Sequence, residues 1–409
     1  MDYLDEYLLL QKNFNLTEDY ICISALDLNI YNIPFGSGGY YTLPGVGDEI
    51  VADELGKNGT VWGEQDTDCI SKTRNIFDIP DQSIGVNSSF RYILLKGRSR
   101  KKSEGVIFLF HGLNEKAWDK YLVWAARLQR LTGKAVILFP ITFHMNRVPD
   151  CWSNARLMNE ISEERKLKYP GLACSSFANA AISTRLSLKP HRFFFSGFQT
   201  YYDIMRLIGQ IKSGTNQFIS PGASIDLFGY SIGAFLSEIL FLADSYDNLS
   251  SSRLFLFCGG TTTDKFQPVT KTIMDSAAYE QFSSFYMKKY EDEVCANSIM
   301  KAFYSNPLPE AVAFQAMLNS QKLVEYRTGR FSRLKDRIFA IPLKQDSVIP
   351  AGSVVETLRC GSADLPVRVE VMDYPYKYSH ETPFPMKGNR QETEHYFSAT
   401  FSRVAEFFE

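Results

Sequence analysis

The chain has 409 residues, of which 45% are hydrophobic and 14% aromatic, so it is long enough to bury a substantial core. Its formal net charge of -2 gives no electrostatic reason to expect binding to nucleic acid or to an anionic membrane surface. The seven cysteines form no CxxC motif and do not pair with histidines, which favours a reducing compartment over a disulfide framework or a zinc site.

The first residues, "MDYLDEYLLLQKNF", are acidic and lack the basic start of a secretory signal. No apolar run approaches the 18 residues that are needed to span a bilayer. We therefore expect a cytoplasmic protein without a membrane span and without a nucleic-acid partner.

Residues 1–89 are predicted to be an N-terminal extension that supplies the first strands and packs on the core. A short helix is expected at the start, and the β-branched and aromatic residues of 19–34 favour extended structure. Residues 35–49 form a turn-rich loop. Its Gly-Ser-Gly-Gly run at 36–39 lacks the Lys-Ser/Thr ending of a phosphate-binding loop, so we do not expect it to bind phosphate.

From residue 90 the pattern changes to short, almost wholly apolar runs bounded by Gly, Pro or polar residues, which is typical of strands buried on both faces. These runs are residues 90–95, 105–110, 134–140, 224–229, 253–258, 337–343 and 367–372. Helical patterns lie between them, at 116–131, 231–244 and 392–408. This alternation predicts an α/β fold with a mostly parallel, twisted sheet flanked by helices.

Two intervals are too long to be simple crossovers between strands. Residues of about 142–223 and 259–336 contain helix-like segments of their own, so we expect helical insertions that form a cap over the sheet edge. The aromatic residues of the second insertion either line an apolar pocket or pack the core of the cap.

One serine lies between two glycines, in Gly229-Tyr-Ser231-Ile-Gly233. A buried strand precedes Ser231 and an amphipathic helix follows it directly. A serine on so tight a strand-to-helix turn is lifted above the sheet edge, and the flanking residues must be small for strand and helix to pass closely. The helix N-terminus then offers free N–H groups beside a developing oxyanion.

With these features, residues 90–409 resemble the α/β-hydrolase superfamily, and more closely a poorly characterised group of bacterial α/β-hydrolase-like proteins. The resemblance implies a nucleophile, an acid and a histidine in that order, each at the end of a strand. Ser231, Asp346 in "KQDSVIP" and His380 in "DYPYKYSH" match this pattern in order and location. They are the predicted catalytic residues.

The resemblance also implies an oxyanion hole with two backbone N–H donors. Ile232 follows the serine and supplies one donor, and Leu113 in "FHGLNE" is the choice for the second. Asn114 is expected to orient this loop and, with His144 and Tyr230, to contribute to the substrate pocket.

Two alternatives remain open for the acid and the base. Asp264 follows the preceding strand, and His395 also lies after the last strand, although its surroundings favour the first turns of a helix. Asp346 could also act only as a helix cap.

The predicted function is a serine hydrolase, most plausibly of carboxylic esters, that acts through an acyl-enzyme on a small-molecule acyl substrate. The alternatives are a non-catalytic ligand-binding protein on the same fold and an acyltransferase. No metal-ligand spacing such as HExxH occurs, so no metal and no cofactor are expected. The sequence does not indicate an oligomeric state.

Overall fold

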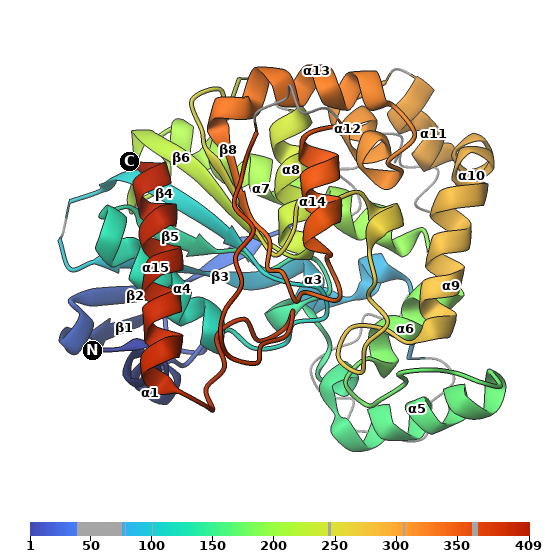
Figure 1. Cartoon of the computed structure of the whole chain (residues 1–409), viewed down its shortest axis with the longest axis horizontal. Helices are drawn as coiled ribbons and strands as arrows, with labels where there is room; N and C mark the ends of the chain where they lie inside the picture. The colour runs from blue at the N-terminus through green and yellow to red at the C-terminus, as the bar shows by residue number, and fades with distance from the viewer. Residues whose placement is uncertain (39–75, 78, 100, 244–246, 306, 362–366) are drawn as a thin grey trace.

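The fold is seen in a computed structural model of the whole chain (Figure 1). The residues that it describes are 1–38, 76–77, 79–99, 101–243, 247–305, 307–361 and 367–409. Most of the loop predicted at 35–49 lies outside the described residues.

The described residues form one nine-stranded sheet in the order β1-β2-β3-β5-β4-β6-β7-β8-β9. The strands are β1 (Tyr20–Ile23), β2 (Leu28–Gly36), β3 (Ser89–Gly97), β4 (Ser103–Phe110), β5 (Ala135–Leu138), β6 (Ile219–Tyr230), β7 (Leu254–Phe257), β8 (Ile338–Ile341) and β9 (Arg368–Val369). The strands from β5 to β9 in this order pair in parallel, whereas β1, β2 and β3 join the sheet through antiparallel pairs. The predicted mostly parallel sheet is therefore confirmed.

The strand order reverses direction at β4, whose neighbours are β5 on one side and β6 on the other. In open α/β sheets the ligand binds outside the carboxyl ends of the strands at such a point, because the connecting segments there leave toward opposite sides. The segments that follow β4 and β6 therefore flank the crevice where a site is expected.

The helices cover both faces of the sheet and extend beyond one end of it. They are α1 (Tyr3–Asn13), α3 (Gly85–Ser88), α4 (Asp119–Thr132), α5 (Ala155–Lys168), α6 (Ala180–Leu188), α7 (Arg192–Lys212), α8 (Ile232–Ala243), α9 (Ser276–Ser284), α10 (Tyr290–Ala296), α11 (Ser298–Ser305), α12 (Pro309–Leu318), α13 (Val324–Leu334), α14 (Ala351–Leu358) and α15 (Arg390–Phe408). A π-helical turn, Phe285–Lys289, joins α9 to α10. Among the described residues, none of these helices has the length and apolar character that crossing a bilayer requires.

Alternate residues of each central strand enter two different apolar cores. In β4, Phe108 belongs to the core that includes residues of α7, α8 and α12, whereas Leu109 belongs to the core that includes residues of α1, α4 and α15. Because successive side chains of a strand point to opposite faces, a strand buried on both faces must be apolar throughout, which explains the continuous apolar runs in the sequence.

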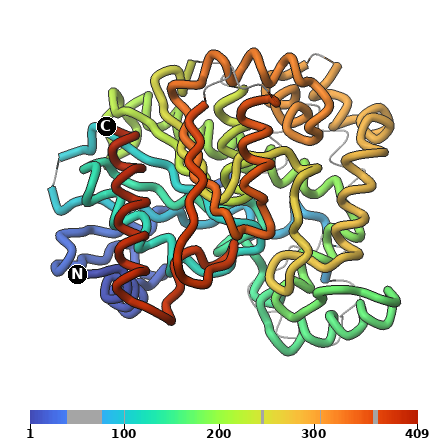
Figure 2. Tube along the Cα trace, in the orientation of Figure 1, coloured from blue at the N-terminus to red at the C-terminus, as the bar shows by residue number. Residues whose placement is uncertain are grey.

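The N-terminal residues are integrated into the molecule. Helix α1 packs on α4 and α15, so the two ends of the chain lie on the same side (Figure 2). Strands β1 and β2 extend the sheet beyond β3.

The two long intervals contain α5–α7 and α9–α13. Helix α7 packs on β6 as a sheet-covering helix, whereas α5, α6, α9 and α10 lie beyond one end of the strands (Figure 1). The first interval thus combines a crossover helix with segments that extend past the sheet.

Candidate active site

Ser231 lies on the turn between β6 and α8, with its backbone in the left-handed region at φ 57°. Its N–H donates to the carbonyl oxygen of Phe257, at the end of the neighbouring strand β7, over 3.2 Å. A non-glycine residue pays a conformational cost of order 1–3 kcal/mol in this region and persists there only when the surrounding structure enforces it. The turn is therefore strained in the manner expected of a nucleophile elbow.

Glycines make this turn possible. A Cβ atom on Gly229 would lie 2.5 Å from the Cα atom of Ala234, and one on Gly233 would lie 2.4 Å from the carbonyl oxygen of Phe110. Gly259, after β7, is equally constrained, because its Cβ would lie 2.3 Å from the Ala234 Cβ. Helix α8 thus starts against the ends of β4, β6 and β7, with no space for a side chain at these positions.

The residues predicted to be acid and base meet this serine. The Nε2 atom of His380 lies 2.7 Å from Ser231 Oγ, and its Nδ1 atom lies 2.7 Å from Asp346 Oδ2. Oδ1 of Asp346 accepts hydrogen bonds from the N–H groups of Val348 and Ile349, both over 2.9 Å. The three side chains are 3–6% exposed. The structure thus brings one hydroxyl, one imidazole and one carboxylate into a single buried chain of hydrogen bonds.

The carboxylate determines which nitrogen of His380 carries the proton. Since Asp346 can only accept, Nδ1 donates to it, and Nε2 of the neutral ring remains free to accept from the serine hydroxyl. Tyr230 holds the histidine from behind: its O–H donates to the His380 carbonyl oxygen, and the two rings stack at 5.6 Å. Tyr230 is therefore a support for the imidazole, and its part in the substrate pocket stays a prediction.

The loop after β4 is held by a buried histidine. His111 donates from Nδ1 to the Gly112 carbonyl oxygen and accepts from the Ile141 N–H at Nε2, each over 2.9 Å. Burial lowers its pKa well below the usual value, so the ring remains neutral and both nitrogens are used. His111 thus holds the loop after β4 against the start of the segment after β5.

The predicted oxyanion donors lie at the two segments that flank the crevice. Ile232 begins α8, so its N–H has no carbonyl partner within the helix. Leu113 belongs to the loop after β4. The neighbouring Asn114 has φ 60°, and its amide donates to the carbonyl oxygens of Ala178 and Thr272, over 2.9 and 2.5 Å. Asn114 thus ties this loop to both long insertions.

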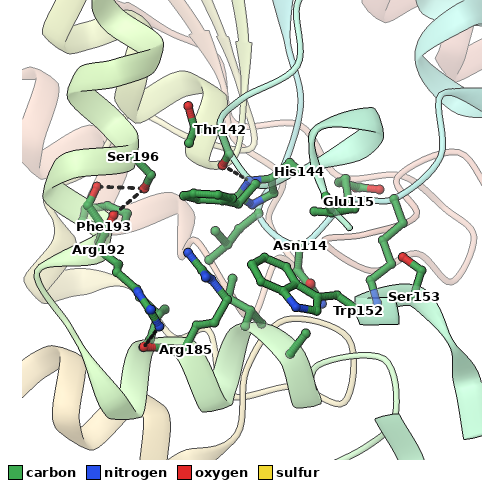
Figure 3. A pocket seen from close by; sticks show the side chains of 17 residues that line it. Asn114, Glu115, Thr142, His144, Trp152, Ser153, Arg185, Arg192, Phe193 and Ser196 are labelled. Carbon is green, nitrogen blue, oxygen red and sulfur yellow. Dashed lines mark hydrogen bonds between the residues drawn. The ribbon is translucent and has the colours of Figure 1, made fainter. Parts of the chain in front are cut away.

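Two small cavities adjoin this loop. An apolar cavity of about 50 Å³ is lined by Leu113, Ile141, Ile232, Phe235, Leu236 and Phe314, among others. A second cavity, of about 70 Å³, has polar and charged residues in its lining (Figure 3). Both are also lined by His144, Phe193 and Ser196, so they are adjacent compartments.

The alternative acid and base, Asp264 and His395, make other contacts. The carboxylate of Asp264 accepts hydrogen bonds from the N–H and Oγ of Ser320, over 3.1 and 2.6 Å. His395 is an exposed residue of α15 whose ring faces Tyr396 at 5.0 Å. His380 therefore binds Asp346, and neither rival takes part in this arrangement. Among the remaining candidates, His144 lines both cavities.

The parallel sheet and the serine on its strand-to-helix turn define an α/β protein of the α/β-hydrolase fold. Residues 1–409 match the model of a family described as a family of unknown function (DUF6051). The chain therefore belongs to that family. No curated protein matches the sequence significantly.

Solved structures of esterases are similar to this chain at low identity. Carboxyl esterase 2 from the mycorrhizal fungus Tuber melanosporum is 11% identical, with a TM-score of 0.43, and the match covers 79% of this chain and 82% of that one. A thermostable esterase from Pseudomonas putida is 13% identical, with a TM-score of 0.40 over 78% and 80% of the two chains. A hyperthermophilic esterase from the archaeon Pyrobaculum calidifontis is 12% identical, with a TM-score of 0.39 over 78% and 82%.

Proposed function

We propose that this protein is a serine hydrolase that cleaves carboxylic esters through an acyl-enzyme intermediate. The observation that carries the proposal is the continuous pair of 2.7 Å contacts from Ser231 Oγ to His380 Nε2 and from His380 Nδ1 to Asp346 Oδ2. A serine hydroxyl is inert at neutral pH without a positioned base, and such a base needs an orienting carboxylate. In support of the proposal, the three side chains are buried and Ser231 lies on the strained turn.

In the proposed reaction, Ser231 Oγ attacks the ester carbonyl carbon while His380 Nε2 takes the hydroxyl proton. Asp346 stabilises the imidazolium that forms. The N–H groups of Ile232 and Leu113 donate to the oxyanion. When the tetrahedral intermediate collapses, the C–O bond to the alcohol breaks and His380 gives its proton to the leaving alkoxide oxygen.

Water completes the cycle by the same route. His380 removes a proton from water as it attacks the acyl carbon, and then returns a proton to Ser231 Oγ as the acid leaves. The apolar cavity beside Ile232 supports a small or medium acyl group as substrate, because it offers about 50 Å³ of mainly apolar space next to the proposed oxyanion donors.

A fluorophosphonate probe tests the proposal, because it reacts only with an activated serine. We expect the wild-type protein to be labelled at Ser231, as shown by peptide mass spectrometry, and Ser231→Ala to lose all labelling. Ser237→Ala is the matched control, since Ser237 is also buried on α8 but its hydroxyl donates to the Gly233 carbonyl oxygen. It should still be labelled.

Absence of labelling in folded wild-type protein would contradict the enzyme proposal and favour the ligand-binding alternative. If labelling occurs, product analysis with added alcohols distinguishes the two reactions. Release of the free acid indicates hydrolysis, and formation of a new ester indicates acyl transfer.

A further inference from the structure

Three side chains in the lining of the second cavity each carry a buried polar atom that has no hydrogen-bond partner among the described residues. These atoms are Nη1 of Arg185, Nε1 of Trp152 and Nε2 of His144. The three side chains are 5%, 3% and 9% exposed. They come from α6, from the turn Asp150–Ser153 and from the loop after β5, and they approach the same space (Figure 3). Buried polar groups are normally paired, so this cluster indicates a site for a polar ligand group.

Arg185 is the charged member of the cluster. Its Nη2 atom lies 3.1 Å from Asp81 Oδ1, and its guanidinium stacks on the rings of Phe143 and Trp152 at 4.2 and 4.3 Å. These contacts hold the guanidinium in place and leave Nη1 unengaged among the described residues. Burial lowers the pKa of Arg185 to about 10, so the group is still a cation at neutral pH.

The surrounding charges leave an excess of positive charge at this cavity. Asp81 is shared, because Arg192 Nε also lies 3.3 Å from the same oxygen. Glu115, the other carboxylate in the lining, pairs with Lys120, and Lys116 adds a further cation at the exposed rim. A buried cation without a full counter-charge is costly, so an anionic ligand group would be stabilised here.

The other two atoms of the cluster, on Trp152 and His144, are uncharged and differ in whether they donate or accept. Trp152 Nε1 is a donor only. His144 donates from Nδ1 to the Thr142 carbonyl oxygen over 2.9 Å, and burial lowers its pKa to about 4, so its Nε2 atom is an acceptor at neutral pH. Arg185 Nη1 and Trp152 Nε1 thus offer two donors for the oxygen atoms of a carboxylate, whereas His144 Nε2 accepts only from a group that carries a hydrogen, such as a water molecule.

The two cavities connect to the proposed site through the oxyanion donors. Ile232 and Leu113 line the apolar cavity, and this cavity shares Leu113 and His144 with the polar one. Ser231 and His380 are both outside the described lining of the two cavities. We therefore assign both cavities to the acyl side of the substrate, because the acyl carbonyl is the group that the oxyanion donors bind.

We propose that Arg185 and Trp152 bind a carboxylate at the far end of the acyl group, so that the preferred substrates are esters of acids that carry a second, free carboxylate. This proposal rests on the proposed esterase function. It assigns the substrate class of the same site, with Arg185 as the residue that determines specificity.

Matched substrates test the proposal on the intact wild-type protein. Monoethyl esters of the dicarboxylic acids from succinate to suberate are compared with the ethyl ester monoamides of the same acids, which have nearly the same shape but no charge. Hydrolysis is followed by chromatography of the products. We expect kcat/KM for the best monoester to exceed that of its amide by about tenfold to a hundredfold, as for a hydrogen bond to a charged group.

Variants identify the residue that causes the preference for the charged ester. Arg185→Gln should reduce the acid-to-amide ratio to near one while the amide ester is still hydrolysed, and Arg185→Lys should keep part of the preference. Arg156→Gln is the control, because Arg156 is an exposed arginine of α5 outside the described lining of both cavities, and it should keep the wild-type ratio.

A wild-type enzyme with no preference for the charged ester overturns the proposal, whether or not the variants fold. An unchanged ratio in folded Arg185→Gln overturns it as well. Fluorophosphonate labelling of Ser231 separates this failure from that of the proposed function, because labelled protein without a carboxylate preference is an esterase of another specificity.

Discussion

At the scale of single residues, Asp346 uses its two oxygen atoms for different purposes. Oδ2 faces His380, while Oδ1 accepts two backbone N–H groups from the loop that carries Asp346 itself. The alternative that Asp346 caps a helix is wrong, because α14 begins only at Ala351 and has no side-chain cap; the two backbone bonds lie in the loop before it. The backbone bonds prevent the carboxylate from rotating away from the ring.

Asp346→Asn should leave the fold intact and lower kcat for ester hydrolysis by about 10⁴-fold, because an amide N–H facing Nδ1 favours the wrong tautomer of His380. Steady-state kinetics and thermal unfolding of the same preparations check this. Asp264→Asn, at the rival carboxylate, should keep kcat within about twofold, and a larger loss for Asp264→Asn than for Asp346→Asn would assign the acid to Asp264.

His144 makes stability depend on pH. Its pKa is lowered to about 4 by burial, whereas an unfolded histidine titrates near 6.5, so the unfolded state binds more protons between these values. The free energy of unfolding should therefore fall by about 2 kcal/mol from pH 7 to pH 5 through this residue alone. Urea unfolding of His144→Gln should show a correspondingly smaller loss. His395→Gln, at an exposed position, should retain the wild-type slope. A wild-type slope in His144→Gln would show that folding does not lower the pKa of this ring.

At the scale of elements, the close start of α8 against β4 fixes the position of the turn that carries Ser231. Gly233 faces the last residue of β4, and the N-terminus of α8 is held there by the packing of its wholly buried side chains. The proposed oxyanion donor Ile232 is the first residue of this helix, so any shift of α8 moves the donor relative to the serine.

Gly233→Ala should destabilise the protein by about 2 to 3 kcal/mol, since its Cβ would lie 2.4 Å from a backbone oxygen that cannot move freely. It should also lower the rate of fluorophosphonate labelling. Gly209→Ala is the matched control: Gly209 is exposed within α7 with no atom near its Cβ position, and alanine there should stabilise by about 0.5 to 1 kcal/mol. Chemical denaturation measures the free energy of unfolding of both variants. Equal values would show that the turn at Gly233 accommodates the added methyl group.

At the scale of the whole molecule, the two ends of the chain are joined through buried charges. Glu6 of α1 is fully buried, and its carboxylate lies 3.4 Å from Arg127 Nη2 and 2.6 Å from Arg130 Nη1, both on α4. Arg127 also faces Glu394 on α15 at 3.4 Å. The N-terminal helix is thus part of one cooperative layer with the last helix.

Glu6→Ala should lower the free energy of unfolding by about 3 kcal/mol, because it leaves the buried Arg127 without this partner. Equilibrium urea unfolding measures the change. Glu163→Ala removes an exposed partner of Lys166 and should cost under about 1 kcal/mol. A loss in Glu6→Ala no larger than this control would mean that α1 adds little to the stability of the whole molecule.

The strands and the candidate site differ in how much the sequence could predict. The central strands were predictable because burial on both faces leaves a continuous apolar run, and Ser231 was predictable because its glycines are adjacent in the chain. The last strand is shorter than predicted: β9 covers Arg368–Val369 at the sheet edge, and Met372 adds an isolated bridge to Leu343. The alternating side chains of residues 367–372 are typical of a strand at a sheet edge. The number of residues that pair depends on the partner strand, and the local sequence does not show this partner.

Other features had no local signal. Tyr230 supports His380 from 150 positions away, and Gly259 is required only because α8 passes close to the end of β7. The polar cavity around Arg185 combines residues from separate segments, none of which has a recognisable spacing relative to the others.

The amino-acid sequence alone determined the class of fold, the strand-to-helix turn at Ser231 and the order of the serine, aspartate and histidine, because each depends on residues that are close together or on the order of elements. Only the tertiary structure decided which carboxylate faces His380 and which polar atoms remain unpaired beside the acyl cavity. The physical reason is that hydrogen bonding and burial act between atoms in space, and a linear pattern does not specify which distant loops converge.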